Sequence, residues 1–179
     1  MIEDDVQLKE LGVSHFSELF SDDGLTNIED QLKVVRPFPT MVSDEEKYVF
    51  LSDITLSEIE SILKGFKKEK SPGPDGWPVE FYLHFFHLIG MDILRAVDQY
   101  RKEGRISGSL NSTFVTLIPK SDKSSSFFDF RPISLYNLIY KVISKLASIR
   151  IKPILDKAIT WNKFGFLHNR KIVEPIGIT

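Results

Sequence analysis

Residues 70–77 read Lys-Ser-Pro-Gly-Pro-Asp-Gly-Trp, and this stretch separates two groups of regular elements. Its two prolines fix the backbone and its two glycines allow unusual conformations, so it cannot continue a helix or a strand. Turns rich in Pro, Gly and Asp are common, and composition alone favours a plain connection between helices. The sequence therefore predicts a shaped loop whose role depends on the residues around it.

Helical patterns lie on both sides of this loop. The segment Thr55-Leu56-Ser57-Glu58 has the form of a capping box and predicts the start of a helix. After the loop, an aromatic-rich run predicts a largely buried helix that Gly104 caps. The two prolines within residues 36–39 end an earlier pattern. The predicted helices are residues 6–20, 28–35, 55–66 and 79–101.

The second half of the chain contains one clear strand. Residues 113–118 alternate and are β-branched, and Pro119 ends them before a Ser-rich turn at residues 120–126. We then expect a helix from about Ile133 to Ile149. An interruption at Pro153 and an irregular basic loop at residues 161–170 follow. These elements predict an α+β fold that is mainly helical.

The charge of the chain is unevenly distributed. Residues 1–63 carry 15 Asp and Glu against 4 Lys and Arg, a net charge of −11. Residues 64–179 carry 10 against 19, a net charge of +9. Basic side chains can neutralise phosphates and release their counterions. We therefore expect an acidic helical segment, residues 1–66, and a basic domain, residues 67–179, that is suited to nucleic acid.

Composition also excludes several classes of protein. The chain has no cysteine, which excludes disulfides, thiolate zinc sites and cysteine nucleophiles. His84 and His87 are three residues apart, but no further ligands stand at a suitable spacing for a metal. No signal peptide and no apolar run of about 18 residues is recognised. We expect an intracellular protein, able to reside in the nucleus, without a membrane span.

Further segments follow the loop in a fixed order, and together they carry a resemblance. This series resembles the reverse transcriptases of LINE-type, non-LTR retrotransposons, which show a KSPGPDG loop, then LIPK and RPISL segments, then a QxGF…R stretch. The resemblance covers about residue 14 to the end, with departures at Lys163, Glu174 and Pro175. The matching segments are Thr116-Leu117-Ile118-Pro119-Lys120, Asp129-Phe130-Arg131-Pro132-Ile133-Ser134-Leu135, Tyr140-Lys141, Ser144-Lys145, Phe164-Gly165-Phe166 and Asn169-Arg170.

The resemblance implies the fingers and the first part of the palm of a right-hand polymerase, incomplete because the catalytic aspartates, the rest of the palm and the thumb are missing. The intact family enzyme is an RNA-directed DNA polymerase that uses Mg²⁺. Its partners are an RNA template, a DNA primer and a deoxynucleoside triphosphate. We expect this chain to supply contacts, with no catalytic residue and no metal bound by the chain alone.

Two groups of binding residues are predicted. Lys120 follows the strand, where its ammonium can meet a triphosphate, and Arg131 can offer its planar fork to phosphate or stack on a base. The alternatives are a solvated turn lysine and an Arg131 paired with Asp129. The second group is predicted to contact nucleic acid. The alternative for each of these residues, considered separately, is a solvated position on the surface. They are Lys70, Lys141, Lys145, Arg150 and Arg170.

A false signal occurs at Phe20-Ser21-Asp22-Asp23, which has the aromatic-x-Asp-Asp form of a polymerase active site. Helical patterns flank it and it precedes the other motifs, so we predict the end of a helix instead. Two other functions stay open. The chain could be a non-enzymatic module that binds nucleic acid or protein, or a decayed element without a function.

Overall fold

The computed structural model describes residues 4–21, 29, 32–33, 36 and 42–159. The chain divides into two compact units, of which the first comprises residues 1–39 and 115–133 and the second residues 40–114 and 134–179. The division predicted between residues 66 and 67 falls inside the second unit, because the helix before the loop packs with the helices after it. Most of the predicted helix at residues 28–35 and nearly all of the basic loop at residues 161–170 lie outside the described residues.

The first unit contains a helix and part of a β-hairpin. Helix α1 spans Asp5–Leu19, as predicted, and begins at Asp4, whose Oδ1 accepts a hydrogen bond of 3.0 Å from the N–H of Val6. A short 3-10 helix, Phe127–Asp129, lies against α1. The imidazole of His15 stacks on the ring of Phe127, with 5.4 Å between ring centres. Aromatic contacts therefore join the two segments.

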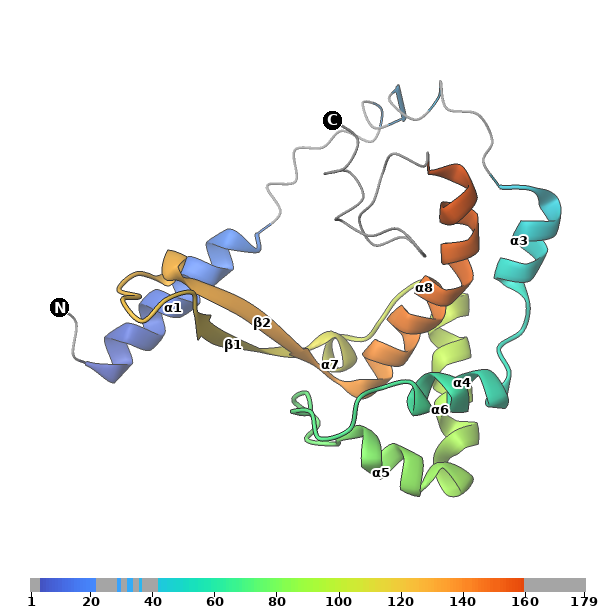
Figure 1. Cartoon of the computed structure of the whole chain (residues 1–179), viewed down its shortest axis with the longest axis horizontal. Helices are drawn as coiled ribbons and strands as arrows, with labels where there is room; N and C mark the ends of the chain where they lie inside the picture. Colours follow the sequence, from blue (N-terminus) through green and yellow to red (C-terminus); the bar gives the residue numbers. More distant parts are fainter. Residues whose placement is uncertain (1–3, 22–28, 30–31, 34–35, 37–41, 160–179) are drawn as a thin grey trace, which may run out of the picture. The chain divides into compact units, whose positions relative to one another are not determined.

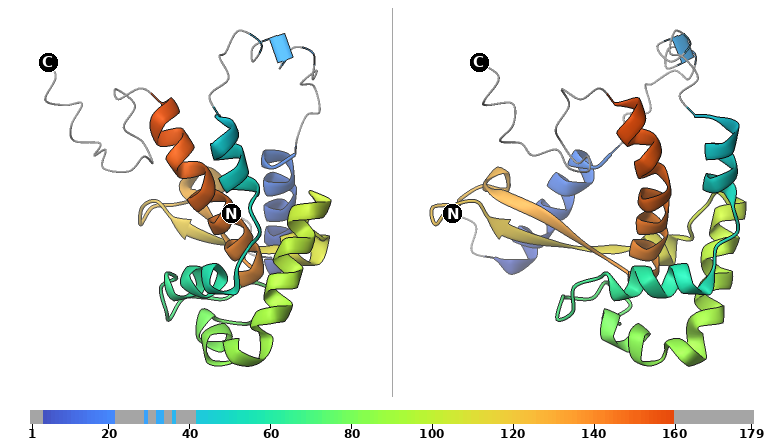
Figure 2. Two further views of the ribbon diagram at one scale, coloured as in Figure 1. Left: turned by 90° about the vertical axis from the view of Figure 1, so that its right-hand side faces the viewer. Right: turned by 45° about the vertical axis from the view of Figure 1, so that its right-hand side comes forward.

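The second unit is a group of helices around one core (Figure 1). Its helices are α3 (Asp44–Leu51), α4 (Leu56–Lys64), α5 (Val79–His84), α6 (Phe86–Glu103), α7 (Gly108–Asn111) and α8 (Leu138–Ala158). Helix α4 begins at the predicted cap, where Thr55 Oγ1 accepts a hydrogen bond of 3.2 Å from the N–H of Glu58. Ile59 and Leu63 on α4 are completely buried, and α4 contacts α5, α6 and α8. Figure 2 shows α3 alongside the C-terminal part of α8.

Strands β1 (Thr113–Pro119) and β2 (Phe130–Tyr136) pair in a two-stranded sheet. Just beyond their ends, the N–H of Lys120 donates a hydrogen bond of 2.8 Å to the carbonyl of Asp129, so the pair is an antiparallel hairpin. Both strands pass from one unit into the other. The sheet and helices confirm the predicted mainly helical α+β composition for the described part of the chain.

The predicted helix from about Ile133 to Ile149 is wrong at both ends. Residues up to Tyr136 belong to β2, because they supply the hydrogen-bonding partner of β1, and α8 begins only at Leu138. Helix α8 also continues through Pro153, where we predicted an interruption. A proline removes one helical hydrogen bond, but packing against α3 and burial of Ile154 hold this part of the helix in place.

The predicted helix over residues 79–101 is two helices. Phe85 leaves the helical conformation between α5 and α6, and its ring packs against Phe81 with 4.9 Å between centres. This break was not predicted, since the apolar pattern runs through it. Gly104 ends α6 in the left-handed conformation, with φ 64°, as predicted.

Candidate nucleic-acid interface

The loop between α4 and α5 lies directly on the junction of β2 and α8. A Cβ atom built on Gly73 would lie 2.4 Å from the main-chain nitrogen of Asn137 and 2.6 Å from the carbonyl oxygen of Tyr136. No side chain fits that space, so this position requires glycine. Gly76 adopts φ 74°, and its N–H closes a turn with the carbonyl of Gly73 at 3.0 Å. The predicted shaped loop is therefore a docked loop.

Asn137 connects this loop to two other segments. Its side chain is 3% exposed. Oδ1 accepts a hydrogen bond of 3.0 Å from the N–H of Asp75, and Nδ2 donates one of 3.0 Å to the carbonyl of Ser109 in α7. A buried amide is stable only when both of its ends have partners. Asn137 thus holds the loop, α7 and the start of α8 together.

The carboxylate of Asp75 organises the inside of the loop. Its Oδ1 accepts a hydrogen bond of 3.2 Å from the N–H of Trp77, and its Oδ2 accepts one of 3.4 Å from the hydroxyl of Tyr82. Burial, followed by the negative charge of Asp75, raises the pKa of Tyr82 to about 12. The hydroxyl is therefore protonated at neutral pH and able to donate.

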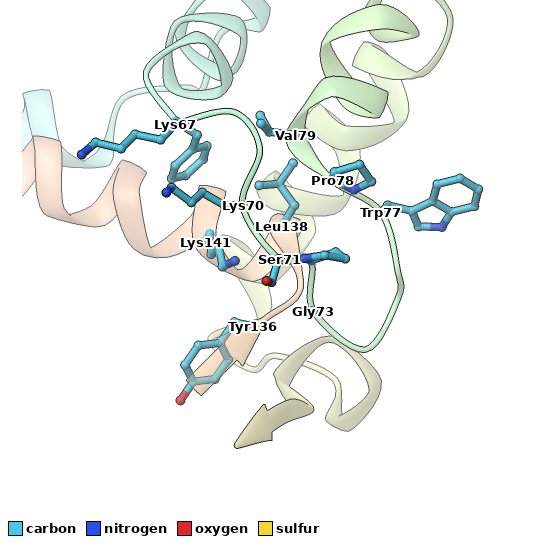
Figure 3. Close-up of a pocket in the computed structure, with 12 residues that line it drawn as sticks. Lys67, Lys70, Ser71, Gly73, Trp77, Pro78, Val79, Tyr136, Leu138 and Lys141 are labelled. Carbon is cyan, nitrogen blue, oxygen red and sulfur yellow. The ribbon is translucent and has the colours of Figure 1, made fainter. Parts of the chain in front are cut away.

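A pocket of about 250 Å³ opens beside the docked loop. Lys67, Lys70 and Lys141 line it, together with Tyr136. Figure 3 shows the side chains of Lys70 and Lys141 approaching one space from the loop and from α8, whereas the indole of Trp77 points away from them. The loop and the helix, which are far apart in sequence, thus bring two predicted nucleic-acid residues together.

Lys141 begins a row of lysines along α8. Lys145 and Lys152 follow at spacings of four and seven residues, which place the three side chains on one face of the helix. Arg150 is nine residues from Lys141, or about 180° around the helix axis, so it points to the opposite face. The fold therefore separates Arg150 from the lysines with which the sequence grouped it.

The lysines around the pocket and along this face differ from four other lysines of the second unit. Lys68 also forms no ion pair within the described residues, but it does not line the pocket. Within the described residues, no carboxylate forms an ion pair with Lys67, Lys70, Lys141, Lys145 or Lys152. Four other lysines each meet a carboxylate at 2.6–2.8 Å, namely Lys47, Lys64, Lys102 and Lys157. Like charges gathered without counter-charges produce a positive field, and such a surface favours an anionic partner. We call the five unpaired residues the lysine surface.

Arg150 has a role inside the fold. Its guanidinium donates to both carboxylate oxygens of Glu58, at 2.9 and 3.1 Å, and its side chain is 9% exposed. It also donates to the carbonyls of Phe50, Ser52 and Asp53 at 3.0, 2.7 and 3.2 Å. These contacts occupy its donors, so we do not include Arg150 among the nucleic-acid contacts.

Lys120 and Arg131, the predicted nucleotide contacts, belong to the first unit. The ammonium of Lys120 donates a hydrogen bond of 2.6 Å to the carbonyl of Phe128. The Asp129 carboxylate accepts hydrogen bonds of 3.0 Å from the N–H groups of residues 125–126, which lower its pKa. Arg131 is exposed, and among the described residues it forms no ion pair with Asp129. The alternative of an Arg131–Asp129 pair therefore finds no support.

The remaining predictions concern residues outside the described ranges, a metal site and a membrane span. Arg170 lies outside the described residues, as do Asp22 and Asp23 of the rejected aromatic-x-Asp-Asp motif; α1 ends just before that motif. In the part of the chain that the structure describes, no three His, Asp or Glu side chains gather to hold a metal, so the Mg²⁺ of the resembled polymerases has no fitting site there. None of the described helices is long and apolar enough to cross a membrane.

Sequence reasoning missed three residues of this region. Lys152 shares a helix face with Lys141 and Lys145, and its spacing of seven from Lys145 could have revealed it once the helix was extended through Pro153. Lys67 joins the pocket only through the path of the loop. No local pattern marks Asn137, because its two partners lie 62 and 28 residues away.

Comparison with known proteins bears on the origin of the chain. No family model matches it. It is similar to a transposon protein. The transposon TX1 uncharacterized 149 kDa protein of Xenopus laevis is 29% identical over 175 residues, or 98% of this chain. The chain spans 13% of the length of that relative. This similarity supports the predicted origin in a transposable element.

Proposed function

We propose that the chain is a segment of the reverse transcriptase of a non-LTR retrotransposon, where it contributes contacts to the template and primer. The ordered motifs around the docked loop and the similarity to a transposon protein support this assignment. The mainly helical α+β architecture is compatible with the fingers and the start of the palm of a right-hand polymerase. The single observation that carries the proposal is the lysine surface.

The lysine surface has dimensions suited to a nucleic-acid backbone. Lys141 and Lys152 are eleven residues apart on α8, about 16 Å along the helix axis at 1.5 Å per residue. A strand of nucleic acid presents several phosphates over that length. Lys70 adds a further ammonium from the loop, at the end of the row nearest Lys141. Each ammonium that meets a phosphate releases a counterion, which provides affinity without a requirement for sequence.

Lys120 and Arg131 are assigned to the triphosphate of the incoming nucleotide. The anchoring of the Lys120 ammonium on the carbonyl of Phe128 leaves further donor hydrogens for a phosphate. The exposed Arg131 retains its five donors within the described part of the chain. An RNA template, a DNA primer and a deoxynucleoside triphosphate are thus the proposed partners.

The proposal is tested by binding of the full chain to a fluorescent RNA–DNA primer–template at a series of salt concentrations. Wild type should bind with an affinity that falls steeply as salt rises. The double variant Lys70→Gln, Lys141→Gln should bind more weakly and reduce the slope of log affinity against log salt by about 2, since each lost phosphate contact removes about 0.9.

The matched control is the double variant Lys64→Gln, Lys102→Gln, which removes the same charge from lysines that already pair with carboxylates. It should leave the slope unchanged. Equal effects of the two double variants would show that net charge, and not the lysine surface, determines the binding. No binding by wild type at low salt would overturn the proposal and favour a module that binds protein.

A further inference from the structure

The pocket beside the docked loop combines positive charge with an aromatic wall. Tyr136 lines the pocket that Lys70 and Lys141 also line. The ring of Tyr136 stacks on that of Tyr140, with 4.5 Å between ring centres and 16° between ring planes. Tyr140 therefore supports one face of the Tyr136 ring from α8. Proteins that bind single strands combine cations, which meet the phosphates, with aromatic rings, a platform on which the bases stack.

We infer that this pocket holds one nucleotide of a single strand, with its base against Tyr136 and its phosphate between Lys70 and Lys141. The inference rests on the proposed nucleic-acid function and specifies the form of nucleic acid that the site accepts. A strand is favoured over a duplex because base faces in a duplex already stack on their neighbours and cannot reach a side-chain ring.

The dimensions of the pocket support a single nucleotide. Its volume of about 250 Å³ lies just below the range of about 300–1,000 Å³ that drug-sized ligands occupy. This space suits one base with part of its sugar, and it is too small for a base pair. Gly73, which lies against the main chain of Tyr136 and Asn137, is one of the residues that line the pocket.

The other aromatic residue of the loop does not form this platform. Trp77 packs on Phe81 with 4.1 Å between ring centres, and its indole points away from Lys70 and Lys141 (Figure 3). Trp77 also lines the pocket, but its ring packs on Phe81 and not on the Tyr136–Tyr140 pair. The variant Trp77→Leu therefore tests whether loss of any large aromatic side chain at the pocket weakens binding. Tyr48 on α3 is 78% exposed and provides a second control, a tyrosine whose ring does not line the pocket.

The experiment measures binding of the full chain to fluorescent oligouridine and to a hairpin duplex of equal charge, for wild type, Tyr136→Leu, Tyr136→Phe, Trp77→Leu and Tyr48→Leu. Loss of a stacked base typically weakens single-strand binding about 5- to 100-fold. We expect that loss for Tyr136→Leu on the single strand, and less than about a twofold change on the duplex. Tyr136→Phe and the two controls should bind as wild type does.

The outcomes separate this inference from the function on which it rests. If the Lys70→Gln, Lys141→Gln variant loses affinity but Tyr136→Leu binds the single strand normally, the lysine surface holds and the nucleotide pocket is overturned. An equal loss on strand and duplex also overturns it. If wild type binds neither, both proposals fail. Competition by a free nucleoside triphosphate, but not by oligouridine, would assign the pocket to a free nucleotide and reject the strand.

A second measurement covers the case in which Tyr136→Leu does not fold. A strand that carries a photoreactive halouridine is irradiated in complex with the wild-type chain, and the cross-linked peptide is identified by mass spectrometry. Cross-linking to Tyr136 supports the inference. Cross-links confined to other residues overturn it.

Discussion

The N–H of Asp75 donates a hydrogen bond of 3.0 Å to Oδ1 of Asn137, across 62 residues of sequence. This bond ties the centre of the loop to the residue before α8. Because Lys70 lies on that loop and Lys141 on that helix, the same bond sets the separation of the two lysines. The shape of the candidate site therefore depends on a neutral residue that has no contact with the proposed ligand.

The substitution Asn137→Asp should destabilise the chain by about 1–3 kcal/mol at neutral pH. It removes the donor to the carbonyl of Ser109 and places a charge at a position that is 3% exposed. The loss should become smaller in acid, because the introduced carboxyl can donate again once protonated. Urea unfolding at two pH values measures both effects. The exposed Asn111→Asp is the control, and an equal loss there would contradict the role of Asn137.

The substitution Gly73→Ala should also destabilise the chain, by about 1–3 kcal/mol, because the added methyl group would lie 2.4 Å from the nitrogen of Asn137. The loop must move to relieve this overlap, so the affinity for nucleic acid should fall as well. Gly108→Ala is the control, since its methyl group meets nothing within 4 Å. Wild-type stability in Gly73→Ala would show that the loop does not dock as described.

Replacement of Arg150 by Met should lower the free energy of unfolding by about 3 kcal/mol, the lower end for a broken buried ion pair, because the Glu58 side chain is 25% exposed. The change removes the donor to Glu58 and to the carbonyls of Phe50 and Asp53. Thermal unfolding measures the loss, and Arg95→Met is the control because its pair with Asp92 is exposed and contributes about 0–1 kcal/mol. The salt dependence of nucleic-acid binding by folded Arg150→Met should equal that of wild type. A reduced slope of log affinity against log salt would show that Arg150 contacts nucleic acid.

The raised pKa of Tyr82 predicts a loss of stability in strong alkali. Its pKa is about 12 in the folded chain against 10 for a free tyrosine, so the folded chain holds the proton more tightly than the unfolded chain. The resulting stabilisation is complete below pH 10 and is lost as the pH rises from 10 towards about 12. Phenolate absorbance and urea unfolding across this window, in wild type and Tyr82→Phe, measure the effect. If both chains lose stability equally, Tyr82 is not the titrating group.

The sequence predicted the elements whose signals are local. Thr55 and Glu58 mark the start of α4, and Gly104 marks the end of α6, because each acts on its own helix. Helix α3 was missed although Ser43 and Glu46 form a capping box at its start. The second half of strand β2 was predicted as the start of a helix because Ile133 and Leu135 fit either period, and only pairing with β1 decides between them.

The candidate site was predictable only in part, for a related reason. Residue type identified Lys70, Lys141 and Lys145 as cations, but the sequence did not show which of them meet a carboxylate. The same limit led to the grouping of Arg150 with them, since Glu58 is 92 residues away. The docking of the loop through Gly73 and Asn137 is a tertiary contact and has no local pattern.

The segment between α3 and α4 is held mainly through its main-chain oxygens. Arg150 and Arg101 both donate to the carbonyl of Ser52, and Arg101 also donates to that of Leu51, whose side chain is 64% exposed. A carbonyl oxygen is the same in every residue, so mutations that change Leu51 or Ser52 leave these bonds intact. Substitution of Leu51 or Ser52 should therefore loosen this segment less than substitution of either arginine does.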